Sequence, residues 1–113
     1  MRRRAIAGLS GALIVAGVSV LASVSMINDR INRAEREMKD DHIASAVELL
    51  GPLAQAGDTR AQGVIAYAYW EGGKGVARNP VKARYWAARL KGNLWSSARD
   101  REQADWCLSR HAA

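Results

Sequence analysis

The pattern of hydrophobic and polar positions changes near residue 27. From residue 5 to residue 27 the chain has 23 residues without a charged side chain, and Arg2, Arg3 and Arg4 precede this run. A helix of that length would reach about 34 Å, enough to cross a hydrocarbon core of about 30 Å. The pattern therefore predicts a basic N-terminus at 1–4 and a transmembrane helix or signal anchor at 5–27.

The same run has a second interpretation as a cleaved signal peptide. Val20-Leu21-Ala22 would serve as a cleavage site, but the apolar run continues through Val24, Met26 and Ile27, which favours an uncleaved anchor. The tight arginine cluster before the run favours a cytoplasmic N-terminus, since Lys and Arg near a span prefer that side. We therefore expect a single-pass membrane protein whose remaining residues lie on the outer, periplasmic or extracellular, side.

Residues 28–40 have a different period. Ile27, Ile31, Ala34 and Met38 form one stripe at helical spacing, with charged residues between them. The pattern predicts an amphipathic stalk at 28–40. The stripe either forms a short self-associating seam, or it packs against the chain's own domain or lies at the membrane interface. Two heptads are too few to establish a coiled coil, and we favour the second interpretation, in either of its two forms.

Helical spacing also continues through the rest of the chain, interrupted by helix-terminating residues. The pattern predicts helices over 42–56, 59–71, 80–91 and 96–109, and so an all-α fold. Pro52 should kink or split the first of these helices near Glu48. Residues that favour helix starts or ends stand at each boundary: Asp40 or Asp41, Gly57, Asp58, Gly72, Asn79-Pro80, Gly92, and Ser96 or Ser97 with Asp100.

The helix predicted at 80–91 has two apolar faces. One face carries Ala83, Trp86, Ala87 and Leu90, and the other carries Val81, Tyr85 and Ala88. A helix with two apolar faces needs two neighbours, as in stacked helical repeats. We expect Trp86 to be buried between two helices, and Trp95 and Trp106 to cover the end of the last helix.

The segment from Pro52 to Trp86 resembles a Sel-one-like repeat, the short relative of the tetratricopeptide repeat. The resemblance covers about a third of the chain closely, with Ala66 in place of a glycine and one extra residue in the glycine loop. The order of small, aromatic and glycine positions carries it: Leu53, Ala54, Gly57, Asp58, Ala61, Gln62, Ile65, Tyr69, Gly72, Gly75, Val76, Asn79, Ala83 and Trp86.

The resemblance implies an α/α hairpin that binds protein partners and catalyses no reaction. On this basis we expect a Sel-one-like repeat at 41–92 and a C-terminal capping helix at 93–113. Tyr69 and Trp86 are expected in the core. Trp70 is a candidate for the concave groove of the repeat, where an exposed aromatic residue would anchor a partner.

The segment at 74–91 is strongly basic. The chain has a net charge of +6. Residues 74–91 contain six Lys or Arg and no Asp or Glu. Arg78, Lys82 and Arg89 are expected to lie toward one strip. A solvated helix face is the favoured interpretation, and an acidic protein partner or an anionic membrane surface is the functional alternative. We do not expect nucleic acid as a partner.

No pattern in the sequence predicts a catalytic, metal-binding or phosphate-binding site. A single cysteine, Cys107, forms no internal disulfide, and His42 and His111 lie far apart, so no metal site is expected. The glycines of 72–75 lack the Ser or Thr of a phosphate loop. We expect no enzyme, no cofactor and no small-molecule substrate. The predicted function is a membrane-tethered protein–protein interaction adaptor; the alternatives are a small subunit of a membrane assembly bound through its hydrophobic helix, or a secreted accessory protein.

Overall fold

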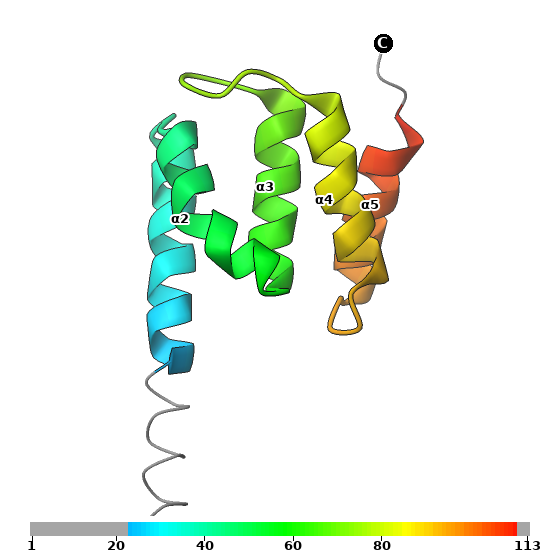
Figure 1. Ribbon diagram of the computed structural model, residues 1–113, viewed down its shortest axis with the longest axis horizontal. Helices are drawn as coiled ribbons and strands as arrows, with labels where there is room; N and C mark the ends of the chain where they lie inside the picture. Colours follow the sequence, from blue (N-terminus) through cyan, green and yellow to red (C-terminus); the bar gives the residue numbers. More distant parts are fainter. Residues whose placement is uncertain (1–22, 111–113) are drawn as a thin grey trace, which may run out of the picture.

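The protein is described by a computed structural model over residues 23–110. A helix described over 23–39 comes first (Figure 1). Four further helices follow it: α2 (Ile43–Gln55), α3 (Thr59–Glu71), α4 (Pro80–Gly92) and α5 (Ala98–Ser109). The predicted all-α class is confirmed for this range, and the four predicted helices agree with the observed bounds to within two residues.

The transmembrane part of the predicted fold is corrected. Among residues 23–110, no helix is both long enough and apolar enough to cross a membrane. Of the segment predicted to span, 5–27, residues 5–22 lie outside the described residues. The remaining five belong to the helix at 23–39, which carries charged residues from Asp29 onward and packs against the other helices through Ile27.

The predicted stalk at 28–40 is instead part of the first helix of the folded module. Ile31 and Ala34 are fully buried in the common core, and Ile27 and Met38 pack against it. The stripe therefore faces the chain's own domain, which is one of the two forms of the favoured interpretation. This burial explains why charged residues occupy the other positions of the segment.

Hydrogen bonds at the helix starts follow the predicted caps in three of four cases. The Asp58 carboxylate accepts from the Ala61 N–H at 2.9 Å, and the Asn79 side chain accepts from the Lys82 N–H at 3.0 Å. Ser97 and Asp100 form a reciprocal capping box. Each bond satisfies a backbone donor that the helix itself leaves without a partner.

The predicted cap of α2 is wrong. His42 occupies the N-cap position and makes no capping bond with its side chain. Asp41 instead has a φ of +61°. The N–H groups of Asp41 and His42 bond back to Met38 and Glu37, so this acid terminates the preceding helix as glycine often does.

Pro52 lies inside α2 without splitting it. The helix runs to Gln55, and Figure 1 shows its ribbon bending before it reaches α3. Gly57, with φ of +101°, ends α2, and Asp58 directly caps α3. Only the turn at 56–58 therefore separates α2 from α3.

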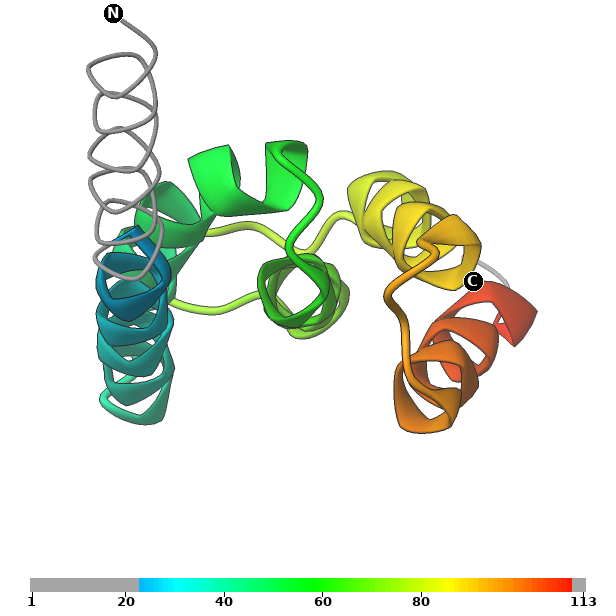
Figure 2. The same cartoon turned by 90° about the horizontal axis from the view of Figure 1, so that it is seen from below.

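The helices lie in two layers (Figure 2). We call α2 and α4 the back layer, and the helix at 23–39, α3 and α5 the front layer. α3 is central and packs against α2, α4 and α5. Small residues, Ala46, Ala61, Ala83 and Ala104 among them, are fully buried and let the helices approach closely.

The repeat positions singled out in the sequence are placed consistently with a helical hairpin. Ala61, Gln62, Ile65, Ala83 and Trp86 are buried, while Leu53 and Tyr69 pack against the core and Val76 is half-buried. Gly57, Gly72 and Gly75 all have positive φ. The buried amide of Gln62 donates to the Ala54 carbonyl at 3.1 Å and accepts from Asn93 at 3.2 Å, which joins α2, α3 and the α4–α5 turn.

The prediction of two buried faces on α4 is wrong. α4 does contact two helices, α3 and α5, but both pack on the face of Ala83, Trp86, Ala87 and Leu90. Trp86 is 7% exposed, as predicted. The face of Val81, Tyr85 and Ala88 is exposed on the outside of the back layer.

Candidate functional site

A groove runs between the three helices of the front layer. Its volume is about 550 Å³, and no residue of α2 or α4 lines it. Figure 2 shows these three helices side by side on one face of the molecule. The lining residues are Glu35, Met38 and Lys39, then Thr59, Arg60, Gly63, Val64 and Tyr67 from α3, and Arg99, Asp100 and Gln103 from α5.

The charges of the groove leave two cations available. The Arg60 guanidinium pairs with Glu35 at 2.8 Å, and Asp100 is held in the capping box of α5. Lys39 and Arg99 are exposed, and neither forms an ion pair within residues 23–110. The groove therefore offers positive side chains at two of its edges, and a carboxylate-bearing ligand would complement them.

Tyr67 is the exposed aromatic residue of the groove. It is 52% exposed and projects from the middle of α3. Opposite it, the Gln103 amide donates to the Gly63 carbonyl at 3.2 Å. A Cβ on Gly63 would lie 3.4 Å from that amide, so the glycine lets the two helices meet closely under the groove. A rigid wall with an exposed tyrosine is typical of a surface that anchors a partner.

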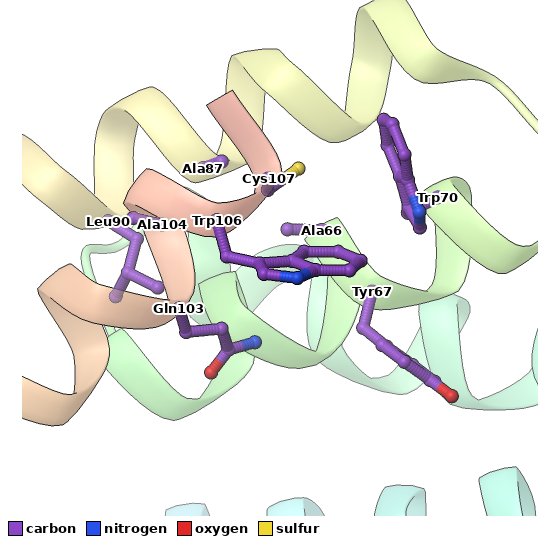
Figure 3. Close-up of a pocket in the computed structure, with 9 residues that line it drawn as sticks. All are labelled: Ala66, Tyr67, Trp70, Ala87, Leu90, Gln103, Ala104, Trp106 and Cys107. Carbon is purple, nitrogen blue, oxygen red and sulfur yellow. The ribbon is translucent and has the colours of Figure 1, made fainter. Parts of the chain in front are cut away.

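A small apolar hollow adjoins the groove (Figure 3). Its volume is about 30 Å³, and Tyr67 and Gln103 line both the hollow and the groove. Figure 3 shows the Trp106 indole beside Ala66, with Tyr67 and Trp70 nearby. The ring centroids of Trp70 and Trp106 are 5.8 Å apart in an edge-to-face arrangement. The hollow has room for a group of about one or two water volumes, which fits a methyl but no cofactor.

Cys107 lines the hollow but is poorly suited to act as a nucleophile. Burial raises the pKa of its thiol above the ordinary value, and the nearby Arg84 charge lowers it to a smaller extent. A thiol with a raised pKa stays protonated at neutral pH, whereas the thiolate is the reactive form. In the part of the chain that the structure covers, no three acidic, histidine or cysteine side chains are placed to hold a metal ion.

The predicted partner-binding residues do not line the groove. The Arg78 Nε donates to the Trp70 carbonyl at 3.0 Å, and its guanidinium lies 5.1 Å from the Trp70 ring centre. The Lys82 ammonium lies 5.2 Å from the Tyr69 ring centre. Arg89 donates twice to Gln55, at 3.0 and 3.1 Å. All three cations contact the chain itself, and their role in binding stays a prediction.

Sequence reasoning missed the residues that the groove brings together. Lys39, Tyr67 and Arg99 stand on three different helices, and no spacing along the chain relates them. One signal was present for Tyr67: this large aromatic residue lies outside the apolar stripe that Ala61, Ile65 and Ala68 form at helical spacing. A large aromatic residue at an outward position of a helix is the kind of residue that a binding surface retains.

Comparison with known proteins adds no further constraint. No protein-family model matches this chain, and no curated protein or solved structure matches it either. The resemblance to a Sel-one-like repeat therefore rests on the residues quoted above and stays a prediction.

Proposed function

We propose that this protein is an interaction module that binds an acidic segment of a protein partner in its front groove. The observation that carries the proposal is the groove itself, with exposed Tyr67 on its wall and the unpaired cations Lys39 and Arg99 at its edges.

The partner's chemistry follows from the lining. Carboxylates would meet Lys39 and Arg99, and an apolar or aromatic side chain would stack on Tyr67. A small apolar group beside it would reach the hollow at Trp106. Exposed charges mainly set the association rate and its salt dependence, so the tyrosine contact should contribute more to the dissociation rate.

The predicted adaptor role agrees with this proposal, and the absence of catalysis stays a prediction. The two alternatives, a subunit bound through a hydrophobic helix and a secreted accessory protein, both depend on the segment predicted at 5–27. Of that segment, residues 5–22 lie outside the described range. The predicted outer-side location likewise stays a prediction.

A photo-crosslinking pair tests the groove. Tyr67 and Tyr85 have nearly equal exposure, 52% and 53%, but Tyr67 lies in the groove and Tyr85 lies on the back of α4. Benzoylphenylalanine placed at either position in the full chain, in the native cells, should give a discrete crosslinked protein only from position 67. Lys39→Glu with Arg99→Glu should abolish that product.

Equal crosslinking from both positions, or a product from position 85 alone, would contradict the groove as the binding site. So would a product from position 67 that persists in the doubly reversed variant at low salt. Circular dichroism of each variant should match the parent, because the substituted side chains are exposed and make no ion pair within residues 23–110.

A further inference from the structure

The turn between α4 and α5 carries the two most exposed of the large hydrophobic side chains in the described range. Leu94 is 93% exposed and Trp95 is 87% exposed, whereas Leu90 before them and Ser96 after them are buried. The prediction that Trp95 covers the end of the last helix is therefore wrong. The fold does not use these two side chains, although a tryptophan offers about 150–250 Å² of surface for burial.

Hydrogen bonds hold this turn in one shape. The Asn93 amide donates to the Gly57 carbonyl at 2.7 Å and to Gln62 at 3.2 Å, and its oxygen accepts from the Trp95 N–H at 3.0 Å. The Ser96 hydroxyl donates to the Leu90 carbonyl. Leu94 and Trp95 thus project from a turn fastened to the α2–α3 turn beside it, so binding there would order little additional backbone.

The first helix begins at the same end of the molecule. Figure 1 shows the residue-23 end of the first helix and the α4–α5 turn at one end, as the up-and-down course of the helices requires. Val24 and Met26 are exposed there. The start of the first helix and the α4–α5 turn therefore lie at the same end of the molecule, on opposite sides of it (Figure 2).

Positive charge flanks the turn. Between residues 89 and 101 there are four cations, Arg89, Lys91, Arg99 and Arg101, and one acid, Asp100, which the capping box engages. Lys91 pairs with Asp105 and Arg89 bonds Gln55, whereas Arg99 and Arg101 form no ion pair in residues 23–110. Tryptophan favours the boundary between lipid headgroups and acyl chains, and nearby Lys and Arg favour anionic lipids. We propose that this end of the molecule docks on the surface of an anionic lipid bilayer, with Leu94 and Trp95 inserted at headgroup depth.

A second copy of the chain fits this turn less well. Leu94 and Trp95 together offer at most about 400 Å², while a stable protein interface buries about 800 Å² on each partner. Two protruding cationic turns would also repel one another. A bilayer needs only a shallow apolar tip with cations behind it.

A pair of labelled variants of the full chain tests the proposal. Leu94→Cys, in a Cys107→Ala background, carries an environment-sensitive nitrobenzoxadiazole dye at the turn. Lys74→Cys in the same background carries the dye on the exposed α3–α4 loop at the opposite end (Figure 1). Both are reconstituted in vesicles of phosphatidylcholine and phosphatidylglycerol, with and without lipids brominated near the headgroup. Both variants retain residues 5–22, so any effect of that segment is matched.

The dye at position 94 should shift to the blue and be quenched several-fold more strongly than the dye at position 74. Adding Trp95→Ser, or removing phosphatidylglycerol, should reduce that quenching. Equal quenching at the two positions would overturn the proposal, and so would no quenching at position 94. A blue shift that grows with protein concentration and is insensitive to brominated lipid would assign the turn to a second copy instead. None of these readouts depends on the groove or on a protein partner.

Discussion

The two layers of this module use similar residues for different purposes. In the back layer, the Arg89 guanidinium bonds Gln55 and the Lys91 ammonium pairs with Asp105 at 2.6 Å. In the front layer, Lys39 and Arg99 border a groove without an ion pair inside the described range. Arg89 and Lys91 of the back layer thus join helices to one another, as Arg60 does in the front layer, whereas Lys39 and Arg99 form no ion pair in residues 23–110.

The aromatic residues differ in the same way. Trp86 of α4 is enclosed by the core, and the Tyr85 ring packs against it edge-to-face at 5.2 Å. Tyr67 of α3 lines the groove and stands half in solvent. The comparison teaches that basic and aromatic residues of 78–91 contact other parts of the fold, while the residues proposed to bind a partner come from three separate helices.

The largest expected effect is at Trp86. Trp86→Ala removes a large side chain from between α4 and its neighbours and should lower the free energy of unfolding by about 3–5 kcal/mol. Tyr67→Ala is the matched change in the front layer and should cost less than about 1 kcal/mol, because the side chain is half exposed. Chemical denaturation of both variants measures the difference. Equal losses would remove the distinction between the two layers.

Glycine substitutions should separate a strained position, at the end of α3, from an unstrained position inside α2. Gly72 has a φ of +67°, and a Cβ there would lie 2.8 Å from the Arg78 backbone nitrogen. Gly72→Ala should therefore destabilise by about 1–3 kcal/mol. Gly51 lies inside α2 with nothing within 4 Å of an added Cβ. Gly51→Ala should stabilise by about 0.5–1 kcal/mol. Thermal melting of the two variants should shift in opposite directions, and a shift in one direction for both would contradict this account.

A smaller effect distinguishes the cations. Arg89→Ala removes two hydrogen bonds to Gln55 and should cost roughly 1 kcal/mol. Arg99→Ala in the groove should change the free energy of unfolding by less than about 0.5 kcal/mol. Urea denaturation at matched ionic strength measures both. An Arg99 loss as large as that of Arg89 would mean that the groove cation is structural.

The smallest effect concerns the pH dependence of stability. Burial raises the pKa of the Cys107 thiol, so the unfolded chain loses that proton at lower pH than the folded chain does. The stability contributed by the neutral thiol is present below the unfolded value of about 8.5 and is lost as the pH rises through the folded pKa. The parent should therefore lose slightly more stability than Cys107→Ala between about pH 8 and 10. Parallel pH dependences of the two melting temperatures would show that the thiol is not linked to folding.

Local signals explain how well the helices could be predicted. Asp58, Asn79 and Ser97 each bond a backbone N–H three residues later, so neighbouring residues alone determine where α3, α4 and α5 begin. Asp41 misled the prediction because an acid usually caps a helix start, whereas here it adopts a left-handed conformation that ends one. The prediction that both apolar faces of α4 are buried failed because apolar periodicity does not reveal which side of a helix its neighbours occupy.

By itself, the sequence determined the all-α class, the helix bounds to within two residues and the burial of Trp86, because each depends on spacing within one helix. The surface on which the Ile31 stripe packs was decided by the tertiary structure. Only the tertiary structure decided the groove, since Lys39, Tyr67 and Arg99 come together through the packing of three helices. It also decided that Arg89 joins α4 to α2 and that Trp95 is left in solvent. Side-chain contacts between helices depend on how the helices cross, and no periodicity along the chain records those angles.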